Sequence, residues 1–294
     1  MVNLALAVAC SVAIGMIFKH TGPQAIDRTA LLTVNYAVAV GVALLLIVLG
    51  GRETGEGLGL SVGLLGLGGG VGALLIAGFY LLAYATDVAG MSLAVGVTRV
   101  SVVIPFLASW LVWNEVPSVA QGGGMILAAA AFFLIARKHR SPTEGALLDG
   151  VDWYAFGVLL LTFCGGGAVD LSMKTFEEGF GAANSRVLFL LLAFGMAFLI
   201  GAGIVAVRAL RFGHWPTRRA VGWGVVLGVA NYGSLEFILR AIAELPGPFV
   251  FPANNIAIMV LSALVGVYGW NERLSRANQV GLGLAVLALL LLRL

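Results

Sequence analysis

The sequence predicts an all-α integral membrane protein with ten transmembrane helices, built as two inverted five-helix repeats. Three observations predict this fold: little charge, regularly spaced apolar runs and a motif that occurs twice. Hydrophobic residues make up 60% of the 294 residues and charged residues only 11%, whereas a soluble domain carries about 25% charge. The mean hydropathy is +1.02. Because so little charge cannot cover a water-facing surface, we expect most of the surface to face lipid.

Ten apolar runs follow one another along the chain, each close to the length of about 20 residues that a membrane-spanning helix needs. The abundance of glycine, 41 residues, is typical of membrane helices that pack closely through small residues. The runs cover approximately 2–18, 30–49, 62–85, 91–113, 118–136, 152–172, 186–207, 220–242, 248–269 and 276–292.

The longest polar stretch, from Arg137 to Asp152, divides the chain near its middle. It contains proline and glycine, which favour turns and loops. The sequence therefore predicts a first five-helix repeat over residues 1–140, a linker over 141–151 and a second repeat over 152–294.

A short motif supports the repeat. Trp113-Asn114-Glu115 ends one apolar run, and the same three residue types recur as Trp270-Asn271-Glu272, 157 residues later. At that spacing Ser118 corresponds to Ser275, and each serine is expected to cap the helix that follows. Five helices is an odd number, so the second repeat must be inverted in the bilayer. Inverted repeats are typical of secondary transporters.

This pattern resembles the EamA-type ten-helix members of the drug/metabolite transporter superfamily over essentially the whole chain. The resemblance is carried by Glu115 and Glu272 after the fourth and ninth runs, by Pro105 within the fourth run, and by Lys19 and Lys174 at the ends of the first and sixth. It implies a metabolite transporter, not an enzyme, with both termini in the cytoplasm. One departure is that the tryptophan-glycine pair common in the first and sixth helices is absent.

The basic residues predict the opposite orientation. The loops after odd-numbered runs hold most of them, including Arg137, Lys138 and Arg140. Basic loops remain in the cytoplasm, which would place both termini outside. The sequence leaves the orientation open.

Arg99 is the leading candidate for substrate binding because it lies midway along the fourth run. A charge within the hydrocarbon region is costly and usually faces a partner or a substrate. Its guanidinium could hold a carboxylate or phosphate with two hydrogen bonds; the alternative is a structural ion pair. Asn254 and Asn255, near the start of the ninth run, approach the corresponding depth in the second repeat. They could bind a polar substrate or simply link helices.

Two carboxylates are candidates for proton coupling. Glu236 and Arg240 are four residues apart in the eighth run and can pair on one helix face; alternatively, Glu236 binds a substrate amine or a proton. Asp170 has the same spacing from Lys174 in the sixth run. The complete substrate-binding prediction is Arg99, Asn254, Asn255, Glu236, Arg240, Asn231, Tyr232 and Tyr80, with Glu236 and Asp170 for proton coupling.

We therefore expect a secondary-active transporter, an exporter or exchanger, of small polar or amphipathic metabolites, with amino-acid-like compounds favoured. It would be a multi-pass protein of the inner or plasma membrane. Its partners would be a small-molecule substrate and membrane lipid, with no nucleic acid and no cofactor, and no Cys/His cluster has metal-ligand spacing. The alternatives are a membrane-embedded enzyme acting on a lipid-linked substrate, which would need clustered catalytic groups, and a scaffold or channel that does not transport by alternating access. The sequence sets no oligomeric state, and a monomer is compatible with it.

Overall fold

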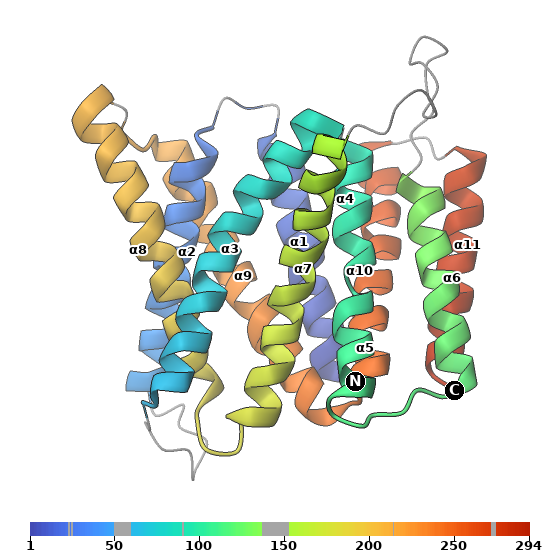
Figure 1. Ribbon diagram of the computed structural model, residues 1–294. Coiled ribbons are helices and arrows are strands. Elements are labelled where there is room, and N and C mark those ends of the chain that lie inside the picture. The colour runs from blue at the N-terminus through green and yellow to red at the C-terminus, as the bar shows by residue number, and fades with distance from the viewer. Residues whose placement is uncertain are drawn as a thin grey trace. The chain divides into compact units, whose positions relative to one another are not determined.

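The computed structural model consists of helices joined by turns and short loops in the residues it describes, which are 1–22, 24, 26–49, 60–89, 91–136, 153–213, 215–271 and 275–294. The predicted linker over 141–151 and Glu272 lie outside these residues. The described helices are shown in Figure 1 and are α1 (Val2–Thr21), α2 (Arg28–Val48), α3 (Val62–Ala89), α4 (Met91–Val100), α5 (Val103–Leu111), α6 (Val119–Ala136), α7 (Trp153–Gly179), α8 (Arg186–Phe212), α9 (Arg218–Glu244), α10 (Gly247–Trp270) and α11 (Arg276–Leu292).

Among the residues that the structure describes, eight helical stretches are long and apolar enough to cross a membrane. One of them, Ala94–Leu111, comprises most of α4 and all of α5. α6 and α11 contain shorter apolar segments, Val119–Phe132 and Asn278–Leu292. By length and composition, the chain is an all-helical, multi-pass membrane protein.

The predicted helix over 91–113 is in fact two helices, α4 and α5, separated at Ser101 and Val102. The predicted run over 152–172 continues as a helix to Gly179, although its last part carries Lys174, Glu177 and Glu178. Lys174 Nζ lies 2.7 Å from Glu178 Oε1, four residues later. Opposite charges four residues apart lie on one helix face and stabilise the helix. α7 can therefore continue beyond the end of its apolar run.

The helices form two compact units. Unit 1 comprises Met1–Ile76 and Ser172–Leu245, and unit 2 comprises Ala77–Leu171 and Pro246–Leu294. Both predicted sequence halves contribute to each unit, and α3 and α7 each contribute residues to both units.

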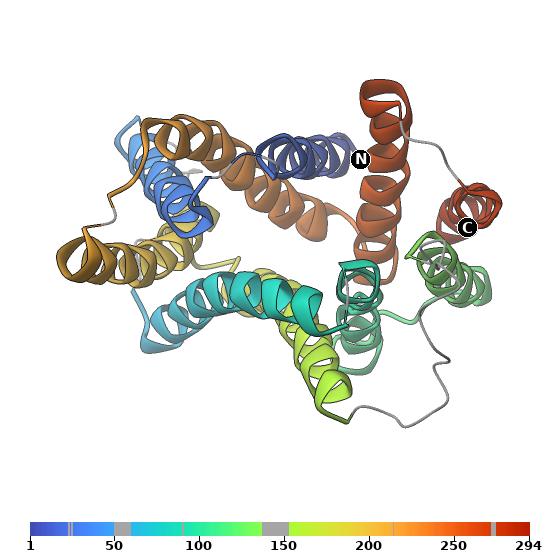
Figure 2. The same cartoon turned by 90° about the horizontal axis from the view of Figure 1, so that it is seen from above.

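In unit 1, α2 packs against α8 and α9, and α9 also packs against α1 (Figure 2). Aromatic side chains pack against one another in the interior of unit 1. The rings of Phe176 on α7 and Phe189 on α8 stack with centroids 4.2 Å apart, while Phe194 contacts both Tyr36 and Tyr232. At the unit's edge, Arg208 Nη1 lies 3.2 Å from Asp27 Oδ2. The Asp27 carboxylate also accepts from the first backbone N–H groups of α2, which caps that helix.

In unit 2, α6 and α11 run side by side, and α10 packs against α5, α6 and α11 (Figures 1 and 2). The predicted caps are confirmed: Ser118 Oγ accepts from Gln121 N at 3.1 Å, and Ser275 Oγ accepts from Asn278 N at 3.2 Å. Among the described residues, the non-glycine residues with positive φ are Asn114, at 57°, and Asn271, at 53°. Both asparagines belong to the repeated motif, and asparagine tolerates this left-handed conformation better than most residues.

Candidate substrate-binding sites

Arg99 lies in the last turn of α4, immediately before the break between α4 and α5. Its Nη1 group donates a hydrogen bond to Asn255 Oδ1 on α10, at 3.2 Å. Asn255 Nδ2 donates to the Phe251 carbonyl one turn earlier, also at 3.2 Å. This second bond fixes the amide with its oxygen toward Arg99. Two residues predicted separately, 156 positions apart, are therefore in direct contact.

The break beside Arg99 follows from Pro105. Proline has no N–H, so no hydrogen bond can form from position 105 back to the Ser101 carbonyl, and the proline ring crowds that carbonyl. The Ser101 carbonyl instead accepts from Ile104 N at 2.9 Å, and Ser101 Oγ donates to the Thr98 carbonyl at 2.6 Å. The regular α-helical hydrogen bonding is interrupted at Ser101 and Val102 and then resumes as α5.

Two glycines of α7 let this break approach closely. A Cβ atom at Gly166 would lie 2.8 Å from Ser101 Oγ, and one at Gly167 would lie 2.8 Å from Ile104 Cβ. Both distances are shorter than side chains tolerate, so this part of α7 has to be free of side chains. Asp170 follows within one turn of these glycines, and its carboxylate interacts electrostatically with Arg99.

Arg99 and Asp170 lie deep among protein atoms, yet both keep some accessible surface. Among the described residues, the hydrogen bond to Asn255 is the one that the Arg99 side chain makes, and the Asp170 carboxylate makes none. A guanidinium carries five N–H donors, so Arg99 retains donors that a ligand could use. Arg99, Asp170 and Asn255 form what we call the unit 2 polar site.

A second contact positions the start of α10. Glu115 Oε2 accepts from the backbone N–H of Gly247, the first residue of α10, at 2.8 Å. A side chain at Gly247 would collide with Ser109 Oγ on α5. A carboxylate at a helix N-terminus is favoured by the unpaired N–H groups and the helix dipole. The Glu115 carboxylate therefore connects the turn after α5 to the start of α10.

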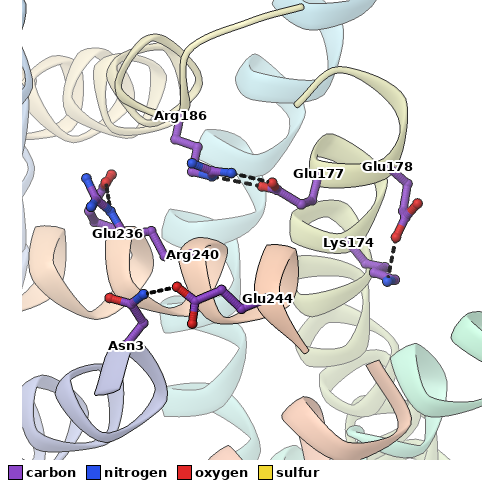
Figure 3. A network of polar contacts seen from close by, with 8 residues as sticks. All are labelled: Asn3, Lys174, Glu177, Glu178, Arg186, Glu236, Arg240 and Glu244. Carbon is purple, nitrogen blue, oxygen red and sulfur yellow. Dashed lines mark hydrogen bonds and ion pairs between the residues drawn. The ribbon is translucent and has the colours of Figure 1, made fainter. Parts of the chain in front are cut away.

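Unit 1 contains a separate polar group on α2 and α9. Glu236 and Arg240 pair as their spacing predicted, with Arg240 Nε 2.8 Å from Glu236 Oε1 (Figure 3). Asn231 Nδ2 donates to Asn35 Oδ1 on α2 at 3.2 Å. Tyr232 lies one turn before Glu236 and interacts electrostatically with it. Glu236 and Tyr232 are 6% and 4% exposed, so these groups are almost entirely enclosed.

Several atoms of this unit 1 group have no hydrogen-bond partner among the described residues. They are Asn35 Nδ2, Tyr232 Oη and Glu236 Oε2, and in unit 2 Asn254 Oδ1 is in the same situation. Unsatisfied buried polar atoms are uncommon in native proteins because each costs free energy. Three of these four atoms belong to predicted site residues, Tyr232, Glu236 and Asn254, and a polar ligand could pair with them.

Sequence reasoning did not identify three of the ion pairs or polar partners of unit 1. Arg186 Nη2 lies 2.6 Å from Glu177 Oε1 and its Nε donates to Glu177 Oε2 at 3.1 Å, a paired geometry that joins α7 and α8 (Figure 3). Asn35 and the Asp27–Arg208 pair were also missed. Glu177 and Arg186 are nine residues apart on successive helices, whereas Asn35 and Asp27 find partners 196 and 181 residues later. None of these pairs lies within one helix, so residue spacing gave no signal of them; a polar residue within an apolar run was the available clue for Asn35.

Tyr80 is the predicted site residue with the greatest exposure. It is 39% exposed, and its ring contacts Phe79 edge-on with centroids 5.8 Å apart. The hydroxyl of its neighbour Tyr84 is hydrogen-bonded to the hydroxyl of Tyr154.

Comparison with known proteins identifies the fold. A solved crystal structure of a protein matches 99% of this chain and 94% of its own chain, with a TM-score of 0.76 and 14% sequence identity. The chain shares a known fold over nearly its whole length. A protein of Haemophilus influenzae (strain ATCC 51907 / DSM 11121 / KW20 / Rd), named only as an uncharacterized protein, is 26% identical over 288 residues, covering 95% of this chain and 93% of the relative. No protein-family model matches the sequence.

Proposed function

We propose that this protein is a secondary-active transporter that moves small polar or amphipathic metabolites by alternating access. The observation that carries the proposal is the unit 2 polar site, in which a partly buried arginine with unused donors lies at a break in a membrane-spanning helix. Discontinuous helices near the middle of the bilayer form the substrate sites of many transporters, because the break frees backbone groups and side chains for a ligand. A charged residue within a membrane-spanning helix that lacks a full set of hydrogen-bond partners also supports a substrate-binding role.

We also propose that the fold comprises ten spans in two inverted repeats, as in the EamA-type members of the drug/metabolite transporter superfamily. The paired left-handed asparagines, Asn114 and Asn271, support equivalent positions in the two halves. Their placement supports inversion. Glu115, next to Asn114, binds the start of α10, whereas Asn271 caps the end of α10. A helix of 24 residues is about 36 Å long, so the two turns are separated by more than the hydrocarbon thickness of about 30 Å.

The chemistry of Arg99 favours a substrate with an anionic group. Arginine holds carboxylates with two parallel hydrogen bonds, and Asn255 orients one edge of the guanidinium. Amino-acid-like compounds therefore remain the favoured class of substrate. The expected mode of transport is export or exchange across the inner or plasma membrane.

Counterflow in proteoliposomes tests the proposal. Purified protein would be reconstituted, the vesicles preloaded with members of a panel of amino acids, carboxylic acids and amines, and entry of the labelled compound measured. Losing a charged hydrogen bond costs about 1.5–3 kcal/mol, so Arg99→Gln should slow exchange roughly 10- to 100-fold. Arg99→Lys keeps the positive charge but loses the planar guanidinium, so its exchange rate should lie between those of the wild type and Arg99→Gln.

Two further variants make this test specific. Arg211 is exposed in the last turn of α8, so Arg211→Gln removes the same charge elsewhere and should exchange like the wild type. The double variant Arg99→Gln/Asp170→Asn removes both charges and keeps the unit 2 polar site neutral, which separates lost binding from misfolding. The proposal is wrong if no compound in the panel exchanges, or if Arg99→Gln exchanges at the wild-type rate.

A further inference from the structure

Asp170 has an unusual position for a partly buried carboxylate. It lies on α7 within electrostatic range of Arg99, but the part of the chain that the structure describes gives its carboxylate no hydrogen-bond donor. A deprotonated carboxylate accepts several hydrogen bonds when it is a structural ion-pair partner. The positive charge that the described residues place near Asp170 is the Arg99 guanidinium, so a substrate anion bound to Arg99 would change the charge balance around Asp170.

The net charge of the unit 2 polar site is zero when Arg99 is positive and Asp170 negative. A substrate carboxylate bound to Arg99 would bring the total to minus one. An unbalanced charge is costly at membrane depth, and the charge is restored to zero if Asp170 binds a proton. The site is then neutral both when it is empty and when it is loaded.

We propose that Asp170 binds a proton when a substrate carboxylate binds Arg99, so that one proton and one carboxylate cross the membrane together. This inference rests on the proposed transport function and adds its coupling ion and its substrate chemistry. A hydronium ion gives a proton to one carboxylate oxygen of Asp170, forming an O–H bond and leaving water. The carboxylate of the substrate replaces Asp170 as the counter-charge of Arg99. On the opposite side the substrate leaves, and Asp170 returns the proton to water.

The number of cations in the unit 2 polar site favours a carboxylate over a phosphate. Arg99 supplies one positive charge, which matches a carboxylate once Asp170 is neutral. A phosphate monoester carries close to two negative charges at neutral pH, and one would remain unbalanced. A zwitterionic amino acid is a different case, because its ammonium group could occupy the position of the proton beside Asp170.

The neighbouring helices bring few other titratable groups to this part of unit 2. α4 contributes Arg99, α10 contributes the neutral Asn255, and the α4–α5 turn contributes Ser101 and Ile104 against Gly166 and Gly167. α3, which packs near Gly165 through Leu81, carries Tyr80 and Tyr84 in this region. Lys174 follows one turn later on α7 and pairs with Glu178.

Proton movement measured together with carboxylate transport tests the inference. Proteoliposomes containing a pH-sensitive dye would be given an outward gradient of monocarboxylates, one at a time, at several pH values from roughly 5 to 8, a range that lies above the usual carboxyl pKa of about 4 and includes that of imidazole. The wild type should move one proton with each carboxylate. Asp170→Asn should move carboxylate with no proton, at a rate that does not vary with pH, and Asp170→Glu should restore the coupled proton. Glu244→Gln removes a half-exposed carboxylate from the end of α9 and should keep the wild-type ratio.

A second measurement needs no transport. Infrared difference spectra of the purified protein, recorded with and without acetate, should show the carbonyl band of a protonated carboxylic acid appearing on acetate binding, and Asp170→Asn should lack that band.

The inference is overturned if the wild type moves carboxylate without a proton, or if Asp170→Asn still moves a proton with each carboxylate. It is equally overturned if zwitterions exchange without proton movement while simple carboxylates do not move, because Asp170 then binds an ammonium group. These results leave the transport proposal intact, whereas failure of every compound to move while the infrared band appears would reject transport and keep the proton site.

Discussion

At the scale of single residues, the choice of an amide at position 255 determines what Arg99 can do. Asn255 Oδ1 accepts one hydrogen bond from the guanidinium, and its Nδ2 group is engaged by the Phe251 carbonyl. An amide orients the arginine without cancelling its charge, whereas a carboxylate at the same position would neutralise it. Asn255 therefore keeps Arg99 positioned and still able to attract an anion.

This argument predicts the effect of Asn255→Asp. The new carboxylate would form an ion pair with Arg99 and compete with any anionic substrate for the same donors. Because a hydrogen bond to a charged group is worth about 1.5–3 kcal/mol, the half-saturating substrate concentration should rise roughly 10- to 100-fold in the counterflow assay. Gln279→Glu, which adds the same charge at an exposed position of α11, should leave that concentration unchanged. Equal affinity in Asn255→Asp and the wild type would show that Arg99 does not bind the substrate.

At the scale of elements, the unit 2 polar site depends on the contact between α7 and the α4–α5 break. Pro105 creates the break, and Gly166 and Gly167 provide the space for it to lie against α7. Asp170 is brought near Arg99 because it follows these glycines on the same helix. The glycines thus set the separation of the two charges, although neither has a side chain.

We predict different effects of alanine at two glycines of α7. In Gly166→Ala the added Cβ would lie 2.8 Å from Ser101 Oγ, and overpacking of this kind costs about 1–3 kcal/mol. Gly157 has no atoms within 4 Å of a Cβ placed there, so Gly157→Ala should be neutral or stabilising by up to about 1 kcal/mol, because alanine favours helix. Thermal unfolding in detergent, followed by tryptophan fluorescence, should show a lower midpoint for Gly166→Ala only. Equal midpoints would mean that α7 is not tightly packed against the break.

The elements were largely predictable because lipid imposes a simple rule on a spanning helix, and all ten apolar runs coincide with described helices. The errors lie where local chemistry overrides hydropathy. Pro105 was recognised, but its removal of one backbone hydrogen bond was not used to predict two helices in place of the one expected over 91–113. The extension of α7 to Gly179 was missed because hydropathy counts Lys174 and Glu178 as polar separately, while in the structure each neutralises the other.

The candidate sites were less predictable than the helices. Spacing on one helix predicted the Glu236–Arg240 pair, which is confirmed. Arg99 and Asn255 were both predicted as site residues because they lie at similar positions along the fourth and ninth apolar runs. Those positions alone did not predict the hydrogen bond between them. Asn35 has its partner on a helix that is distant in sequence, and Glu177 has its partner on the next helix along the chain. Both partners follow from packing between helices, which a single sequence does not specify.

At the scale of the whole molecule, the sequence halves and the structural units divide the chain differently. Each unit takes helices from both halves, so neither half is predicted to be a stable folding unit alone. The unit 2 polar site illustrates this interdependence, since Arg99 and Asp170 come from the two halves of the sequence and Asn255 from the second. A mechanism that uses this site requires the complete chain.

The same reasoning predicts where the two repeated turns lie. If the halves are inverted, the turn at Asn114 and the turn at Asn271 face opposite sides of the membrane. The chain contains two cysteines, Cys10 and Cys164, so a Cys10→Ser/Cys164→Ser background can receive Val116→Cys or Asn271→Cys at exposed turn positions. A membrane-impermeant thiol reagent added to intact, uniformly oriented cells should label one variant, and the other should be labelled only after the membrane is permeabilised. Labelling of both variants from the same side would show that the halves are parallel, which removes the physical basis for alternating access by exchange of two inverted halves.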